Sequence, residues 1–213
     1  FIYRHADIAD TKKDTSSDNV KNATENLQRL DNLLADAGIA SRRKSGEMIR
    51  EGKVTVNSLK VDQPGFRINA SKDLVMVNGQ PVSFETNRQL IYIALNKPRG
   101  YVCSDTDSKG NQMRAIDLLK PFFDEWAARK KNTPPPRLFN VGRLDVSSCG
   151  LIFFTNDGDW ANKVAHPSFN LTKEYLIETP TIPTQAQIDT MRKGTYVTGA
   201  LCVPLLVHAI RGQ

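Results

Sequence analysis

The sequence predicts an α+β protein with a small first domain and a larger second domain. Apolar residues recur at helical spacing early in the chain, and short strand patterns with turn signals follow them. Further along, a strong strand pattern opens a second region that also contains a helical segment. A length of 213 residues leaves room for one full domain beside a smaller one. No apolar run is long enough to span a bilayer, so we expect no membrane partner.

Two short helices are predicted at the start of the first domain. Residues 30–37 place leucine and alanine side chains at helical spacing, and Gly38 is a stop signal. Ser41 lies in an N-cap position ahead of residues 42–50, and Gly52 ends this second helix. The spacing therefore predicts a pair of helices joined by a tight turn.

A β-hairpin is predicted after the two helices. Residues 53–56 alternate between apolar and polar side chains, as in a half-buried strand. A further strand over residues 74–77 meets Asn78-Gly79, which is a strong hairpin signal, and the chain returns through residues 81–84. Together with the helices, these strands complete a compact unit.

The second domain begins after a short linker at residues 85–90. A strong strand over residues 90–95 leads into a turn at residues 96–100, where proline and glycine interrupt the pattern. Residues 116–126 are predicted to be helical. The basic, proline-rich residues 130–136 interrupt the domain, and a surface insertion is the expected explanation.

Positive charge gathers around the second predicted helix. The net charge of the chain is +6, which favours a polyanionic partner such as nucleic acid. Two interpretations stand side by side: an ordinary solvated helix face, or guanidinium and ammonium groups directed at RNA phosphates. The residues concerned are Arg42, Arg43, Lys44, Arg50 and Lys53.

A carboxylate near an arginine is the main candidate for chemistry. Asp145 and Arg143 lie in a predicted turn ahead of a buried strand at residues 151–154, and Asn156-Asp157-Gly158 form a second turn. A paired arginine keeps a partly buried carboxylate ionised and available as a nucleophile. The alternative is a structural Arg–Asp pair that braces a loop. The residues alone leave both interpretations open.

The sequence offers no spacing typical of a metal site. Neither the cysteines nor the histidines come in pairs at ligand spacing, so we expect no metal. Three scattered cysteines also argue against a disulfide framework and for a reducing intracellular compartment. His166 precedes a proline and is expected to cap or pack a loop, and Trp126 and Trp160 are expected to be core or partly buried residues. The dispersed residues are Cys103, Cys149 and Cys202, with His5, His166 and His208.

Residues 27–75 resemble the S4-like RNA-binding domain. The resemblance rests on Arg29-Leu30-Asp31, on the run from Leu34 to Arg43, and on the run from Ile49 to Asn57. Helix stop, basic cap, glycine and strand all follow in order. The resemblance implies docking on structured RNA, which proteins recognise mostly by shape and backbone. It implies RNA contacts from Ser41, Arg42, Arg43, Lys44, Arg50 and Lys53.

The second domain resembles the RsuA/RluB-type pseudouridine synthases. The resemblance implies a mixed, mainly antiparallel sheet flanked by helices, ribosomal RNA as the substrate, and neither metal nor cofactor. The motifs that carry it are Asn96-Lys97-Pro98-Arg99-Gly100, Gly142-Arg143-Leu144-Asp145, Gly150-Leu151, Thr155-Asn156-Asp157-Gly158, His166-Pro167-Ser168 and Lys173-Glu174-Tyr175.

The resemblance also implies a role for each of four residues. Asp145 would be the nucleophile that attacks the target uridine, and Arg143 would hold its carboxylate and help keep the base out of its helix. Tyr175 would stack on the uracil, and either its hydroxyl or a bound water would serve proton transfer at C5. Lys173 would contact a phosphate or the active-site carboxylate. The target base must be flipped out or single-stranded for Asp145 to reach it.

The expected domains are a disordered tail at residues 1–26, an S4-like domain at 27–84 and a catalytic domain at 90–213. The glycine- and arginine-rich segment that closes the family's cleft does not appear before Gln213, so we expect the catalytic domain to be incomplete. Two alternatives stay open. One is a non-catalytic RNA-binding or ribosome-assembly protein on the same scaffold, and the other is a metal-dependent nuclease that uses Asp145 and Asp157. We expect a monomer, in the chloroplast rather than the bacterial cytoplasm.

Overall fold

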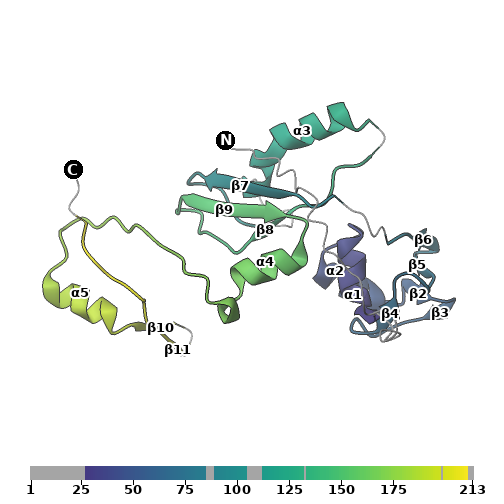
Figure 1. Ribbon diagram of the computed structural model, residues 1–213, viewed down its shortest axis with the longest axis horizontal. Coiled ribbons are helices and arrows are strands. Elements are labelled where there is room, and N and C mark those ends of the chain that lie inside the picture. The colour runs from purple at the N-terminus through teal and green to yellow at the C-terminus, as the bar shows by residue number, and fades with distance from the viewer. Residues whose placement is uncertain (1–26, 85–88, 105–111, 132, 198, 211–213) are drawn as a thin grey trace, which may run out of the picture. The chain divides into compact units, whose positions relative to one another are not determined.

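The computed structural model describes residues 27–84, 89–104, 112–131, 133–197 and 199–210. Contacts divide the chain into two compact units, with the boundary between Leu171 and Thr172. Figure 1 shows the course of the chain. The predicted tail at residues 1–26 and most of the predicted linker lie outside the described residues.

The two predicted helices of the N-terminal domain are confirmed. They are α1 (Leu30–Asp36) and α2 (Arg42–Arg50). Ser41 caps α2, because its side-chain oxygen accepts a hydrogen bond from the backbone N–H of Lys44 at 3.3 Å. A capping side chain of this kind satisfies one of the backbone donors that a helix leaves free at its start.

A four-stranded antiparallel sheet with the order β3-β2-β5-β6 accompanies the helices. The predicted hairpin is confirmed, since Asn78 and Gly79 both have positive φ (51° and 77°), as a two-residue type I′ turn requires. A separate antiparallel pair joins β1 to β4. The strands are β1 (Leu27–Arg29), β2 (Val54–Val56), β3 (Leu59–Lys60), β4 (Arg67–Asn69), β5 (Val75–Val77) and β6 (Gln80–Val82).

The helices and the sheet enclose one hydrophobic core. Leu30 and Leu34 of α1 are fully buried, as are Ile49 of α2 and Val54 of β2. These side chains come from every fourth position of a helix or every second position of a strand, so the sequence periodicity translates directly into a buried face. The core fixes α1 against α2 and thereby positions the basic residues that surround them.

A three-stranded antiparallel sheet with the order β7-β9-β8 forms the centre of the next part. Its strands are β7 (Tyr92–Lys97), β8 (Phe139–Val141) and β9 (Gly150–Thr155). Ile93 lies opposite Phe154, and Leu95 lies opposite Ile152. All four side chains are buried, so one face of the sheet is a continuous apolar surface.

Helices cover both faces of this sheet (Figure 1). The 3₁₀ turn η1 (Ala115–Leu119) and α3 (Lys120–Arg129) contribute Phe122 and Trp126 to the core around Phe154. On the other face, Trp160 of α4 (Gly158–Ala165) makes edge contacts with the rings of Tyr92 and Phe153, at centroid distances of 5.0 and 5.5 Å. Both tryptophans are half-buried, as predicted.

Three local predictions come out differently or are refined. The predicted turn at Asn156-Asp157-Gly158 is wrong at its last residue, because Gly158 begins α4 and Asp157 is its N-cap, accepting the Trp160 N–H at 3.0 Å. Strand β7 continues through Lys97, where a turn was expected. His166 does cap a loop: its Nδ1 accepts the Ser168 N–H at the start of the short 3₁₀ helix η2 (Pro167–Phe169).

The second compact unit, Thr172–Gln213, contains one helix and one hairpin among its described residues. Helix α5 (Gln185–Arg192) begins with a capping box, in which Thr184 and Gln187 satisfy each other's backbone N–H groups. Strands β10 (Thr195–Val197) and β11 (Ala200–Cys202) pair antiparallel. With helices beside antiparallel sheets throughout, the predicted α+β class is confirmed. None of the helices in the described ranges has the length and apolar character needed to cross a membrane.

Candidate active site and RNA-binding face

A cleft of about 420 Å³ lies where two loops of the β7-β9-β8 sheet meet. Its lining contains Asp145, whose side chain is exposed. A volume of this size is within the usual range for small-molecule sites. Its walls are Val102 and Cys103 on one side and Arg143, Leu144, Asp145 and Val146 on the other.

The loop that carries Asp145 leaves β8 through a glycine. Gly142 has φ of +74°, a left-handed conformation that turns the chain sharply and that other residues adopt at a cost. The carbonyl of Asp145 then accepts a hydrogen bond from the Ser148 N–H at 3.0 Å, which closes a tight turn. Leu144 packs against the buried core under the sheet. The loop is therefore anchored on both sides of the carboxylate.

The facing loop, residues 98–103, holds this turn through two further hydrogen bonds. The Gly100 N–H donates to the Val146 carbonyl at 2.7 Å, and the Leu144 N–H donates to Sγ of Cys103 at 3.4 Å. These two bonds fix the residue before Asp145 and the residue after it. The cleft is thus built from two loops that support each other.

Lys97 anchors the facing loop from below. Its side chain is completely buried, and its ammonium donates to the carbonyls of Pro98 at 3.0 Å and Tyr101 at 2.9 Å. A buried ammonium that bridges two carbonyls of one loop restricts the path of that loop. Sequence reasoning placed Lys97 in a turn and missed this role. Its burial follows from its position on the inward face of β7, two residues after Leu95 and four after Ile93.

Arg143 and Asp145 both line the cleft, but the geometry differs from the expected pair with a partly buried carboxylate. Both side chains are exposed. Across the described part of the chain, no hydrogen bond or ion pair joins the two. The reason is their place on a loop that projects from the sheet into solvent, where water solvates each charge. The structure therefore brings Arg143 and Asp145 to one cleft without pairing them.

Lys173 and Tyr175 are the two predicted site residues that do not belong to the first compact unit. Both belong to the second compact unit, in a stretch with no helix or strand, and the Tyr175 side chain is 67% exposed. The positions of the two units relative to each other are not determined. The geometry of the site therefore includes only residues of the first unit, and the roles expected for Lys173 and Tyr175 stay predictions.

The predicted RNA-binding residues gather at α2 and the strand that follows it. The side chains of Arg42, Arg43, Lys44, Arg50 and Lys53 are all exposed. Lys44 pairs with Glu47 at 3.0 Å, and Lys53 pairs with Glu51 at 2.5 Å. Within the described ranges, Arg43 and Arg50 have no ion-pair partner, so both are available to an anion.

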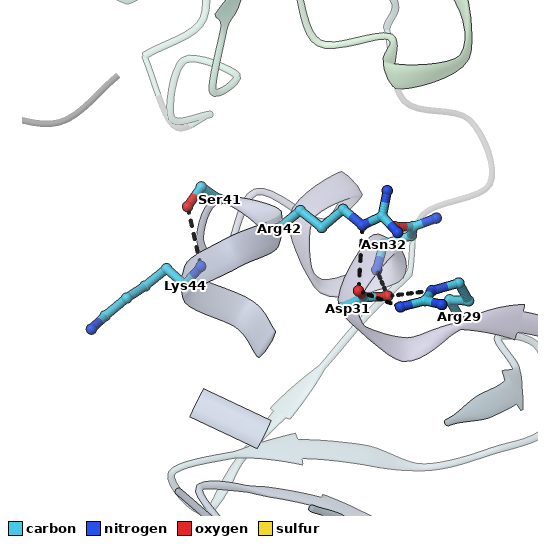
Figure 2. Close-up of polar contacts among 6 residues, drawn as sticks. All are labelled: Arg29, Asp31, Asn32, Ser41, Arg42 and Lys44. Atoms are coloured by element: carbon cyan, nitrogen blue, oxygen red, sulfur yellow. Dashed lines mark hydrogen bonds and ion pairs between the residues drawn. The ribbon is translucent and has the colours of Figure 1, made fainter. Parts of the chain in front are cut away.

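One buried carboxylate organises part of this face and was not among the predicted site residues. Asp31 is 5% exposed and forms ion pairs with Arg29 at 2.9 Å and Arg42 at 3.3 Å (Figure 2). Burial raises the pKa of Asp31, but the hydrogen bonds and charges of the two arginines outweigh it, and the pKa is lowered overall. In the sequence, the Arg29-Leu30-Asp31 triplet could have indicated a pair between Arg29 and Asp31. It does not indicate that Arg42, eleven residues after Asp31, binds the same carboxylate.

Asp157, the second carboxylate of the nuclease alternative, has a structural explanation. Its Oδ1 accepts the Trp160 N–H at the start of α4, and its Oδ2 accepts the Tyr92 hydroxyl at 2.7 Å. Both oxygens are thus engaged by the fold. Among the residues that the structure describes, no group of three or more His, Cys, Asp or Glu side chains is placed to hold a metal ion.

The sequence of residues 91–199, which contains the whole cleft, matches the RNA pseudouridylate synthase family, and residues 28–74 match the S4 domain. The chain belongs to the RNA pseudouridylate synthase family. The resemblance stated from the motifs is therefore confirmed, as is the order of an S4 domain followed by a pseudouridylate synthase domain.

Two relatives of this pseudouridylate synthase family member come from a plant and a bacterium. A chloroplastic protein of Arabidopsis thaliana, named as a ribosomal large subunit pseudouridine synthase, is 44% identical over 91% of this chain and 46% of its own length. The ribosomal large subunit pseudouridine synthase B of Bacillus subtilis is 37% identical over 79% of this chain and 62% of its own length. The chain thus spans about half to two thirds of these relatives. A crystal structure of a pseudouridylate synthase aligns with a TM-score of 0.44 at 26% identity, over 81% of this chain and 67% of the other.

Proposed function

We propose that this protein isomerises uridine to pseudouridine in ribosomal RNA, with the Asp145 carboxylate as nucleophile. The observation that carries the proposal is an exposed carboxylate in an open cleft, within the segment that matches the RNA pseudouridylate synthase family. Loops 98–103 and 142–148 hold the backbone on both sides of Asp145, so the nucleophile is presented from a fixed position.

The reaction is redox-neutral and needs no co-reactant. The bond between N1 of uracil and C1′ of the ribose breaks, the base turns, and a bond forms between C5 and C1′. C5 loses its hydrogen as a proton, and N1 gains one. A carboxylate that forms a transient covalent bond, to the ribose or to the base, divides this exchange into two easier steps. Because the two loops of the cleft exchange hydrogen bonds, the backbone on both sides of the carboxylate is held in place while the base turns.

Arg143 is proposed to contact the target nucleotide rather than to pair with Asp145 in the free protein. Its exposed guanidinium lines the same cleft and can bind a phosphate next to the flipped base. Tyr175 is proposed to stack on the uracil and to assist proton transfer at C5, and Lys173 to contact a phosphate or the carboxylate. Support for these two roles comes from the family motif Lys173-Glu174-Tyr175.

The S4 domain is proposed to dock the protein on folded RNA. Arg43 and Arg50 have exposed guanidinium groups with no ion-pair partner in the described ranges, and they can contact phosphates from the α2 face. The names of the two relatives point to the RNA of the large ribosomal subunit as the first substrate to test. The chloroplast is the proposed compartment, supported by the chloroplastic relative. Detection of the protein only in cytosolic fractions would overturn this placement.

Tritium release tests the proposed reaction. Ribosomal RNA labelled at C5 of uridine releases its label as water when pseudouridine forms. The Asp145→Ala variant is expected to release none while RNA affinity stays within about twofold, since Asp145 is a single exposed side chain. Asp124→Ala, which removes an exposed carboxylate from α3, is the control and should react normally. Release that persists in Asp145→Ala would refute the assigned nucleophile. RNA binding without release in the parent protein would favour the binding-only alternative.

A further inference from the structure

The ion-pair cluster around Asp31 carries an inference about how the RNA-binding face is built. We propose that Asp31 is a positioning residue, whose buried carboxylate holds Arg29 and Arg42 so that both guanidinium groups present their free edges to RNA phosphates. Arg29 thereby becomes a further RNA contact. This inference rests on the RNA binding proposed for the S4 domain.

The geometry around the carboxylate is that of a clamp. The Asp31 side chain is 7% exposed. Oδ1 accepts from Nε of Arg29 at 3.0 Å, and Oδ2 accepts from Nη2 of the same guanidinium at 2.9 Å. Oδ2 also accepts from Nε of Arg42 at 3.3 Å. Figure 2 shows the carboxylate between the two arginines, which come from the end of β1 and the first position of α2.

The guanidinium groups keep donors for a second partner. The side chains of Arg29 and Arg42 are 41% and 60% exposed, although the carboxylate that holds them is buried. Arg42 donates to Asp31 through Nε alone, so the N–H groups of its two terminal amino groups are left for a second partner. A planar guanidinium binds a phosphate through two parallel N–H groups, and its affinity rises when the plane is fixed in advance.

The clamp is supported from behind by the loop before β4. The backbone N–H of Leu30 donates to the Phe66 carbonyl at 2.8 Å, and that of Asp31 donates to the Pro64 carbonyl at 3.3 Å. Gly65, which stands between Pro64 and Phe66, lies against Arg29: a Cβ added to this glycine would meet the Arg29 guanidinium at 3.4–3.6 Å. The loop therefore limits where Arg29 can lie, and the plane of its guanidinium is fixed on one side.

Asp31 could affect RNA binding through its negative charge or through its hold on the two arginines, and these two explanations predict opposite effects of removing the carboxylate. A carboxylate near a phosphate-binding surface repels RNA, so if only net charge mattered, Asp31→Asn would bind RNA more tightly. If Asp31 positions the arginines, its removal frees two long side chains, and binding weakens despite the added positive charge. If both arginine side chains must be ordered when RNA binds, the RNA affinity falls on the order of tenfold.

The test measures binding to a transcript of large-subunit ribosomal RNA over a series of salt concentrations. Asp31→Asn is compared with the parent protein and with Asp62→Asn, which makes the same chemical change at an exposed aspartate of the same domain. The folded fraction of each variant is measured by circular dichroism, and affinity is expressed per folded molecule. We expect about tenfold weaker binding and a shallower salt slope for Asp31→Asn, and no loss for Asp62→Asn.

Arg29→Lys provides a second measurement that does not depend on whether Asp31→Asn folds. Lysine keeps the charge and loses the planar fork, so weaker binding is expected; affinity equal to that of the parent would overturn the proposal. Binding by Asp31→Asn as tight as that of Asp62→Asn would also overturn it. A parent protein without salt-dependent RNA binding would instead refute the RNA binding proposed for the S4 domain, which is a separate outcome.

Discussion

Replacing Lys97 by methionine separates the stability of the fold from the geometry of the cleft. Methionine has a similar length and no charge, so it fills the buried space that Lys97 occupies. The Pro98 and Tyr101 carbonyls lose their donor, at 3.0 and 2.9 Å respectively. A carbonyl left without a partner costs up to about 1–3 kcal/mol when it is out of contact with water; Pro98 is exposed and Tyr101 is half-buried, so the two together cost at most about 2–6 kcal/mol. In the other direction, the variant no longer buries an ammonium group, which removes a desolvation cost of several kcal/mol.

These opposing terms predict a small net change in the free energy of unfolding, about 0–3 kcal/mol, and a large change in activity. Loop 98–103 loses the hydrogen bonds from the Lys97 ammonium, while it still contacts the residues on both sides of Asp145. Since a displacement of about 1 Å can cost roughly a hundredfold in rate, we expect the single-turnover rate of pseudouridine formation to fall at least tenfold.

Urea denaturation and single-turnover kinetics on the same Lys97→Met preparation check this prediction. Lys120→Met, which removes an exposed ammonium from α3, is the control and should change neither quantity appreciably. A variant with the stability of the parent and an unchanged rate would refute the idea that Lys97 supports the cleft. A variant that loses more than about 5 kcal/mol would show that the gain from removing the buried charge was overestimated.

Three further predictions concern the folded domains. Because the pKa of Asp31 is lowered in the folded protein, its ion pairs stabilise the fold above the unfolded pKa of about 3.9, and this stabilisation is lost as pH falls through the folded pKa. In urea titrations, the difference in unfolding free energy between the parent and Asp31→Asn should therefore shrink from pH 6 to pH 2. A difference that does not depend on pH would contradict this prediction. Phe154→Ala, at a side chain 1% exposed in the central strand β9, should cost about 3–5 kcal/mol in the same assay, and a loss below about 1 kcal/mol would contradict the packing described. Gly79→Ala meets no atom within 4 Å of the added Cβ, so it should cost only the backbone strain at φ of +77°, about 1–2 kcal/mol in thermal unfolding, and an unchanged midpoint would argue against the type I′ turn.

Elements with a local signal were predictable from the sequence. Helix α2 follows from its serine cap and the glycine stop at Gly52, and the β5–β6 hairpin follows from Asn78-Gly79. Strands β7 and β9 carry long apolar runs. The paired strands β1 and β4 were missed, since each has three residues and neither has an alternating pattern of its own. Their pairing depends on partners about 40 residues away, which local patterns do not encode.

The candidate site was predictable to the level of its motif and no further. Asp145 and Arg143 stand out because the family motif contains them, and the cleft contains both. Their expected pairing depended on burial, which a loop projecting into solvent does not supply. Lys97 looked like a turn residue because Pro98 and Gly100 follow it closely, and both favour turns. Asp157 looked like a turn residue because the residue types that favour turns also cap helices.

Direct detection of the product tests the central claim, which is that Asp145 in this cleft converts uridine to pseudouridine. Large-subunit ribosomal RNA is incubated with the parent protein or with Asp145→Asn, digested to nucleosides and separated by chromatography, with RNA binding measured on the same samples. We expect pseudouridine with the parent, none with Asp145→Asn, and equal RNA affinity for the two proteins. Equal amounts of pseudouridine from both would contradict the assignment of Asp145 as the nucleophile.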